Sequence, residues 1–157
     1  DAIKISSPFA GSGFISPEDY KNFELPYLRQ VSDSIKANGK SAYVHTCGSI
    51  NDRLEAIAEA GLSGLECLDP PPLGDVELED AFRRIGSKMY IKGNIDSVNT
   101  LLEGSEEQIT EDVKQRLLCG MKNPGFILST ACSIAPRAPK ENVQMISRLA
   151  KQFGQYK

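Results

Sequence analysis

The chain has 157 residues, of which 40% are hydrophobic and 25% charged, and its net charge is −3. This length is sufficient for one hydrophobic core, so we expect residues 1–157 to form a single domain. The slight negative charge argues against nucleic-acid binding, which needs a basic surface, and no apolar run approaches the roughly 20 residues of a membrane span.

The four cysteines lie far apart in the sequence. Small secreted proteins that depend on disulfides carry their cysteines much more densely. We therefore expect a cytoplasmic protein whose thiols are reduced, metal-bound or buried. The chain begins at Asp1, without a methionine, and passes directly into an apolar run. We expect it to be a piece of a longer protein.

Short apolar runs alternate with helical patterns five times along the chain. The predicted strands, each expected to be buried on both faces, are Ala2–Ser6, Ser41–Thr46, Leu62–Leu68, Lys88–Asn94 and Gly125–Ala131. The predicted helices follow Ser16, Ser49 and Ser105 and occupy Val76–Ile85 and Pro139–Phe153. In the first helix, Pro26 should break or kink the backbone near Glu24.

This alternation of strands and helices predicts an α/β fold with a parallel sheet. Two architectures are compatible with five such units. One is an open, doubly wound sheet, and the other is the second half of a (β/α)8 barrel, which needs about 250 residues when complete. In both, the chemistry is expected at the carboxyl ends of the strands.

The polar residues follow that rule. His45, the only histidine, lies two residues before Cys47 at the end of a predicted strand. Residues i and i+2 of a strand point to the same face, so an imidazole and a thiol should converge there as metal ligands, with zinc the ordinary occupant. The alternative is a lone histidine beside an inert thiol.

Cys132 follows the last predicted strand, 85 residues after Cys47, and is the natural third ligand. Two thiolates and one imidazole leave one position of a zinc site open, which is typical of catalytic rather than structural zinc. The alternative for Cys132 is a small apolar residue in a turn. We expect Cys67 to face the opposite way, packed under a helix, and Cys119 to lie in the core.

Glu66 and Asn94 are the candidate catalytic residues. Glu66 interrupts an apolar strand, and a buried carboxylate needs a metal, a cation or a proton. It is either a fourth, displaceable metal ligand or the partner of a lysine or arginine in the barrel. Asn94 ends the fourth predicted strand, where it would hold a substrate carboxylate or amide, or only cap the loop.

Six stretches, taken in order, resemble the uroporphyrinogen decarboxylase superfamily. They are Asp1–Phe9 with Ile15-Ser16-Pro17, His45-Thr46-Cys47-Gly48, Pro70–Asp75, Gly93-Asn94-Ile95, Gly125–Ser129 and Ala138–Val143. The resemblance implies a (β/α)8 TIM-type barrel, of which the chain would supply the carboxy-terminal five βα units.

The superfamily contains two chemistries. The resemblance to the corrinoid-linked methyltransferases, with their H-x-C motif and distant cysteine, implies zinc held by His45, Cys47 and Cys132. It implies transfer of a methyl group between methylcobalamin, either bound to a corrinoid protein or as free cobalamin, and a small thiol acceptor. The alternatives are metal-free decarboxylation of a porphyrinogen and a non-catalytic fragment. Because five units cannot close a barrel, we expect this chain to self-associate through its exposed strand edges.

Overall fold

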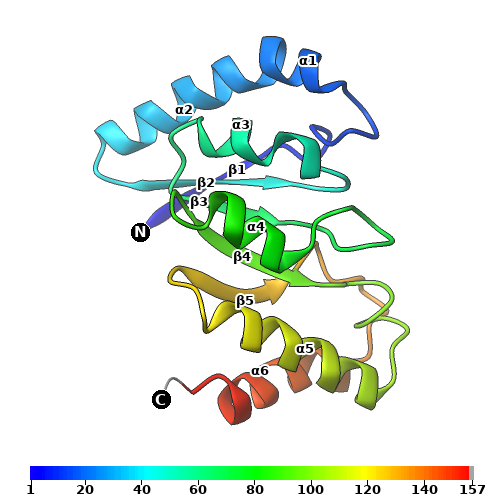
Figure 1. Cartoon of the computed structure of the whole chain (residues 1–157). Helices are drawn as coiled ribbons and strands as arrows, with labels where there is room; N and C mark the ends of the chain where they lie inside the picture. Colours follow the sequence, from blue (N-terminus) through cyan, green and yellow to red (C-terminus); the bar gives the residue numbers. More distant parts are fainter. Residues whose placement is uncertain (156–157) are drawn as a thin grey trace.

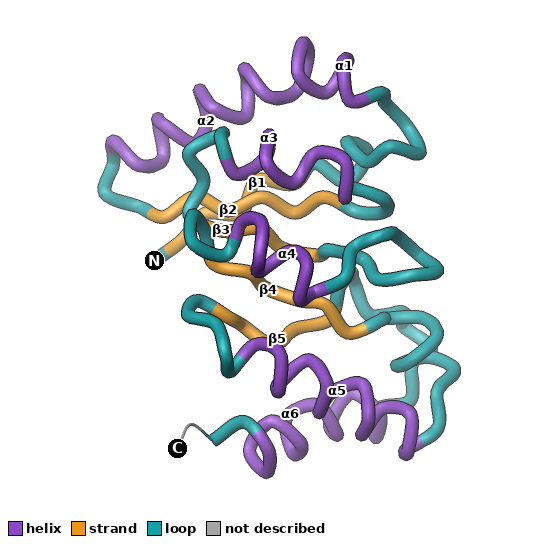
Figure 2. Tube along the Cα trace, viewed as in Figure 1, coloured by secondary structure: helices purple, strands orange, loops and turns teal. Residues whose placement is uncertain are grey.

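The computed structural model describes residues 1–155 and contains one sheet of five parallel strands (Figures 1 and 2). The strands are β1 (Ala2–Ser6), β2 (Ser41–Thr46), β3 (Gly64–Cys67), β4 (Tyr90–Ile95) and β5 (Phe126–Thr130). They lie side by side in the order of the sequence, β1-β2-β3-β4-β5. The predicted α/β fold is confirmed, and this arrangement is that of a partial (β/α)8 barrel.

Helices follow each strand, and Figure 1 shows α2, α3, α4 and α5 in succession along the sheet. The helical elements are α1 (Pro17–Asp19), a π-helical turn (Tyr20–Glu24), α2 (Leu25–Ala37), a 3₁₀ turn (Asn51–Arg53), α3 (Leu54–Ala58), α4 (Leu78–Ile85), α5 (Glu106–Gly120) and α6 (Lys140–Phe153). Right-handed crossovers between strands in sequential order place successive helices on the same face of the sheet. The opposite face is the one that would line the inside of a barrel.

The main hydrophobic core lies between the sheet and these helices. Val44, Leu65 and Ile91 are paired across β2, β3 and β4 and are almost fully buried. Burial of an aliphatic side chain of this size stabilises the fold by roughly 1.5–3 kcal/mol. Because side chains alternate along a strand, the residues that follow these three in sequence point to the opposite face. The core therefore determines which residues lie on the inner face of the sheet, opposite the helices.

The expectation that every strand is buried on both faces is wrong for β1 and β5. Four of the five residues of β1 are exposed and no residue of β5 is fully buried, whereas all four residues of β3 are buried. The difference follows from position, because β1 and β5 are edge strands and β3 is the central strand of the sheet. Ile3 of β1 and Ile127 of β5, the other edge strand, are among the exposed large hydrophobic residues.

Two of the three serine caps are formed as predicted. The Ser16 hydroxyl accepts from the Asp19 backbone N–H, and Ser105 forms a complete capping box with Gln108. The prediction of a cap at Ser49 is wrong, because the helical segment begins later, after Ile50, and has no side-chain cap of its own. The backbone N–H groups at the start of this helical segment bind a carboxylate from a distant loop instead, as described below.

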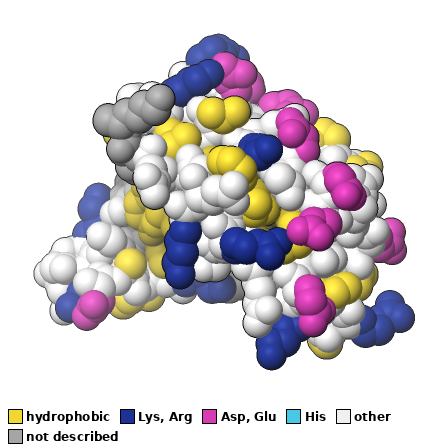
Figure 3. Space-filling model, turned by 90° about the horizontal axis from the view of Figure 1, so that it is seen from below, with side chains coloured by type: hydrophobic (Ala, Val, Ile, Leu, Met, Phe, Trp, Pro, Cys, Tyr) yellow, Lys and Arg dark blue, Asp and Glu magenta, His cyan; other side chains and the backbone are white. Residues whose placement is uncertain are grey.

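No helix among residues 1–155 is long and apolar enough to cross a membrane. Viewed from below, the surface mixes basic, acidic and hydrophobic side chains over the face shown (Figure 3).

Candidate metal centre

The inner face of the sheet carries a row of polar residues from neighbouring strands. Ser6, His45, Glu66 and Lys92 are paired in register across β1, β2, β3 and β4. They follow the buried core residues by one position, so strand alternation turns them away from the helices. His45 is thus placed near the carboxyl end of β2, where the chemistry of parallel α/β proteins is found.

The three predicted metal ligands meet at this end of the sheet. His45 Nε2 lies 3.1 Å from Cys47 Sγ, and Cys47 Sγ lies 3.5 Å from Cys132 Sγ. Cys47 belongs to the loop after β2, and Cys132 follows β5. The two cysteines are 85 residues apart in the sequence, and the curvature of the sheet brings them together.

A turn at Gly48 returns the chain so that the Cys47 thiol faces His45. Gly48 has a φ of 74°, a backbone conformation that residues other than glycine rarely adopt. Its backbone N–H donates to Asp69 Oδ2 at 2.7 Å. A Cβ atom on Gly11 would lie 2.6 Å from the Cys47 carbonyl oxygen, so a second glycine allows another loop to pack closely against this turn.

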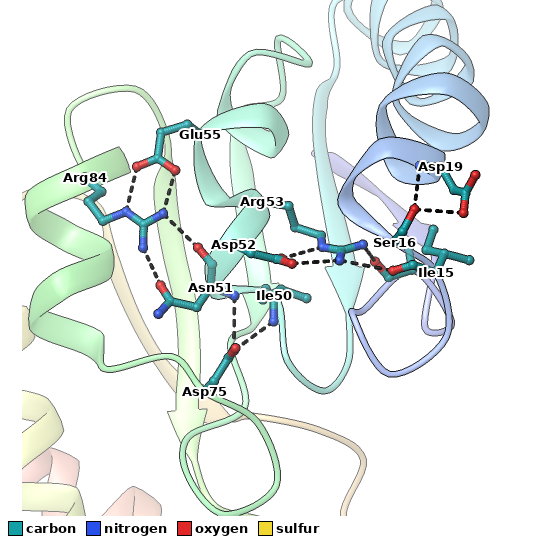
Figure 4. Close-up of polar contacts among 11 residues, drawn as sticks. Ile15, Ser16, Asp19, Ile50, Asn51, Asp52, Arg53, Glu55, Asp75 and Arg84 are labelled. Atoms are coloured by element: carbon teal, nitrogen blue, oxygen red, sulfur yellow. Dashed lines mark hydrogen bonds and ion pairs between the residues drawn. The ribbon is translucent and has the colours of Figure 1, made fainter.

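The segment that follows Cys47 is fixed by charged side chains (Figure 4). Asp75 accepts from the backbone N–H groups of Ile50 and Asn51 at 2.9 and 3.1 Å. The guanidinium of Arg53, fully buried, donates to the Ala10 carbonyl oxygen at 2.9 Å. These contacts hold the loop that carries Cys47 against its neighbours. Sequence reasoning missed Asp75 because its partners are 24 and 25 residues away.

Arg84 ties the same segment to α4. Its Nη2 donates to the Asn51 carbonyl oxygen at 2.8 Å and to Glu55 Oε2 at 2.5 Å (Figure 4). Hydrogen bonding to Arg84 is the main reason that the pKa of Glu55 falls from its ordinary value of 4.5 to about 2. This network lies on the helix side of the sheet and supports the candidate metal centre from outside.

The prediction that Cys67 packs under a helix is wrong. Its Sγ belongs to a group of four possible ligand atoms, with those of His45, Cys47 and Cys132, that all lie within 4.8 Å of one another. The reason is local backbone conformation, because Cys67 has a φ of 95° and Leu68 a φ of 55°. Cys67 is the last residue of β3, and its positive φ departs from the regular strand alternation on which the prediction depended.

Glu66 is surrounded by cations. It forms ion pairs with Lys92 and, at 3.8 Å, with Lys4, and its Oε2 lies 3.4 Å from His45 Nδ1. Burial alone would raise the pKa of Glu66, but the hydrogen bond and charge of Lys92 outweigh burial and lower it. Glu66 is therefore an anion held beside the imidazole, and the lysine partner that the sequence left open is present. Its role in catalysis stays a prediction.

Asn94, the other candidate catalytic residue, is fully buried at the end of β4. Its amide nitrogen donates to the Leu68 carbonyl oxygen at 2.9 Å, and its Oδ1 has no hydrogen-bond partner among residues 1–155. The contact with Leu68 helps to hold the loop after β3. A role in binding substrate stays a prediction.

The three predicted ligands fit a zinc ion. Two sulfur atoms bound to one zinc at about 2.3 Å lie roughly 3.7 Å apart, and a sulfur and a nitrogen roughly 3.5 Å apart. The corresponding distances here are 3.5 and 3.1 Å. Burial, and then the neighbouring Cys132 thiol, raise the pKa of Cys47 to about 12. A bound cation would offset the cost of placing thiolates so close together.

A model of the uroporphyrinogen decarboxylase (URO-D) family matches residues 1–153. The chain belongs to this family. Its relatives are named for two different activities. A methylcobamide:CoM methyltransferase MtaA from Methanosarcina barkeri is 30% identical over 93% of this chain. A uroporphyrinogen decarboxylase from Carboxydothermus hydrogenoformans is 32% identical over 97% of this chain.

A solved structure of a methyltransferase from Methanosarcina mazei has the same fold. It covers 99% of this chain with a TM-score of 0.85 and 27% sequence identity. The chain spans 43% of that protein and about 40% of the curated relatives. The family and the fold are thereby shown, and the family's members are enzymes of both kinds.

Proposed function

We propose that the protein is a zinc-dependent methyltransferase that moves a methyl group between a corrinoid and a thiol acceptor. The observation that supports this proposal is the convergence of His45, Cys47 and Cys132 within ligand distance. These side chains come from the ends of β2 and β5, with the two cysteines 85 residues apart in the sequence, and they present one imidazole and two thiols to one point. This donor set leaves one of zinc's four positions open.

In this proposal His45 Nε2 and the Sγ atoms of Cys47 and Cys132 hold the metal. When bound, zinc would supply the positive charge that keeps an acceptor thiol deprotonated and nucleophilic at neutral pH. The partners are methylcobalamin, either free or on a corrinoid protein, and a small thiol. The names of two methyltransferase relatives, both methylcobamide:CoM methyltransferases, support this choice of substrates.

Glu66 orients the imidazole. Its Oε2 faces His45 Nδ1 at 3.4 Å, which leaves Nε2 directed at the thiols. Neither of these two atoms has a hydrogen-bond partner among residues 1–155, so the contact is one of charge and proximity. In metal sites, a carboxylate beside the non-ligating nitrogen of a histidine helps to fix the ring and its tautomer. Lys92 and Lys4 in turn hold the Glu66 carboxylate in place and balance its charge.

Metal analysis and a methyl-transfer assay on the full-length protein test the proposal. We expect one zinc per protein and demethylation of methylcobalamin when 2-mercaptoethanol is added. Cys47→Ser and Cys132→Ser should each lose zinc and activity. Cys119→Ser is the matched control, because Cys119 lies on α5, outside the ligand group, and should leave both unchanged.

The second candidate function is decarboxylation of a porphyrinogen, which is suggested by the name of a relative of 32% identity, a uroporphyrinogen decarboxylase. It predicts decarboxylation of uroporphyrinogen that is insensitive to chelators and to substitution of Cys47 and Cys132. Such a result, together with no bound zinc, would replace the methyltransferase proposal.

A further inference from the structure

A third thiol points into the candidate metal centre. Cys67 Sγ lies within 4.8 Å of the ligand atoms of His45, Cys47 and Cys132. The side chain is completely buried, so a contact with solvent does not explain its position. Three ligands suffice for a zinc site with an open position, and Cys67 is additional to them.

The backbone is bent to bring Cys67 there. A strand residue at this position would point toward the helices, as Leu65 does two residues earlier. Instead Cys67 has a φ of 95°, in a region that residues other than glycine rarely occupy. The thiol therefore faces the same point as His45.

The Cys67 thiol also has an acceptor of its own. It donates to Asp69 Oδ2 at 3.3 Å, and that oxygen also accepts from the Gly48 backbone N–H at 2.7 Å. Asp69 is only 4% exposed, and within the described part of the chain its Oδ1 has no hydrogen-bond partner. A buried carboxylate with an unpaired oxygen, beside three thiols, is costly unless a cation is near. This is a second, independent indication that a cation belongs here.

We propose that Cys67 is a third thiol ligand of the metal and that an acceptor thiol displaces it. This inference rests on the proposed zinc site. Without an acceptor, the Cys67 thiolate binds the metal at the position left open by His45, Cys47 and Cys132. When an acceptor R–SH arrives, the bond from the metal to Cys67 breaks and a bond from the metal to the acceptor sulfur forms. The acceptor's proton moves to Cys67, so net charge is unchanged.

The arrangement of Asp69 makes this exchange reversible. A protonated Cys67 that has left the metal already has its acceptor, Asp69 Oδ2, in place. Cys47 and Cys132 contact each other, and neither thiol donates a hydrogen bond to a carboxylate among residues 1–155. Cys67 is therefore the thiol that the protein can accommodate in both states. It would guard the metal against other ligands until a thiol is present.

X-ray absorption spectroscopy of the zinc-loaded, full-length protein in thiol-free buffer tests the proposal directly, because it counts the sulfur atoms bound to zinc. We expect three sulfurs in the unmodified protein, and still three after 2-mercaptoethanol is added. Cys67→Ser should show two sulfurs without the added thiol and three with it. Cys119→Ser is the control and should behave like the unmodified protein.

Cobalt substitution gives an independent readout. In Cys67→Ser the sulfur-to-cobalt absorption should fall by about a third, because one of three thiolates is lost. Because Cys67 is buried and its variant risks misfolding, the decisive measurement is the sulfur count of the unmodified protein. Two sulfurs without added thiol would overturn the role of Cys67 and leave the zinc site intact. No bound metal would overturn both proposals, whereas three sulfurs without methyl transfer would overturn only the proposed function.

Discussion

Gly74→Ala is predicted to damage the candidate metal centre through the backbone alone. A Cβ atom on Gly74 would lie 2.3 Å from the Asp69 carbonyl oxygen and 2.8 Å from the Gly48 carbonyl oxygen. Neither contact is with a flexible side-chain end, so both loops must move apart. The hydrogen bond from Gly48 N–H to Asp69 Oδ2 joins these same two residues.

The expected cost has two parts. Overpacking of this kind typically destabilises a protein by about 1–3 kcal/mol. Weakening the hydrogen bond to the Asp69 carboxylate adds up to about 1.5–3 kcal/mol. For a domain of this size, each kcal/mol lowers the melting temperature by roughly 2–4 °C. The melting temperature of Gly74→Ala should therefore fall by roughly 2–24 °C, and the zinc affinity should fall with it.

Thermal unfolding followed by circular dichroism, with and without zinc, measures both effects. Gly13→Ala is the matched control, because a Cβ atom at Gly13 would have no neighbour within 4 Å. If Gly74→Ala melts within about 1 °C of Gly13→Ala and binds zinc equally well, the argument from close packing is refuted.

Three further predictions concern charge and assembly. Glu66→Gln should weaken zinc binding by about 10–100-fold in a competition assay with a chelator, because His45 loses the carboxylate that orients it; unchanged affinity would exclude that role. Glu55→Gln should lower the free energy of unfolding in urea by about 0.2–1 kcal/mol at pH 7, a small effect because Glu55 is 51% exposed. Because the pKa of Glu55 is lowered from 4.5 to about 2 in the folded protein, this difference should be complete above pH 4.5 and vanish as the pH falls to 2. The 157-residue chain expressed alone should elute as a dimer or larger species in size-exclusion chromatography, since β1 and β5 are open sheet edges; a folded monomer would contradict this.

The parts of the site that the sequence predicts are those set by strand periodicity. His45 and Cys47 could be paired because residues two apart share a face, and Cys132 because carboxyl ends of parallel strands meet at one edge. Lys92 could have been found in the same way, since it lies on a neighbouring strand with the same alternation as its partner Glu66. It was overlooked because a single lysine on a strand is usually exposed.

The remaining parts depend on tertiary structure. The approach of Cys67 to the metal ligands requires a positive φ at a residue that is not glycine, which no pattern in the sequence indicates. The cap at Ser49 failed because Asp75, in a loop 24 residues further on, binds the Asn51 backbone N–H instead. Such contacts between loops are set by the packing of the whole sheet, and local propensity does not contain them.

The choice between the two activities of this family therefore depends on the site and not on overall similarity. The chain is 30% identical to a methyltransferase and 32% identical to a decarboxylase, so identity favours neither. A fold supports many chemistries, and function must be argued from the groups that meet in the site. Bringing three thiols and an imidazole within 4.8 Å is costly in the absence of a metal. Burial is the main reason that the pKa values of Cys47 and Cys67 are raised, and a buried Asp69 oxygen has no hydrogen-bond partner among residues 1–155. A soft divalent cation removes that cost, and a reaction whose acceptor is a thiol uses the same preference of the metal for sulfur.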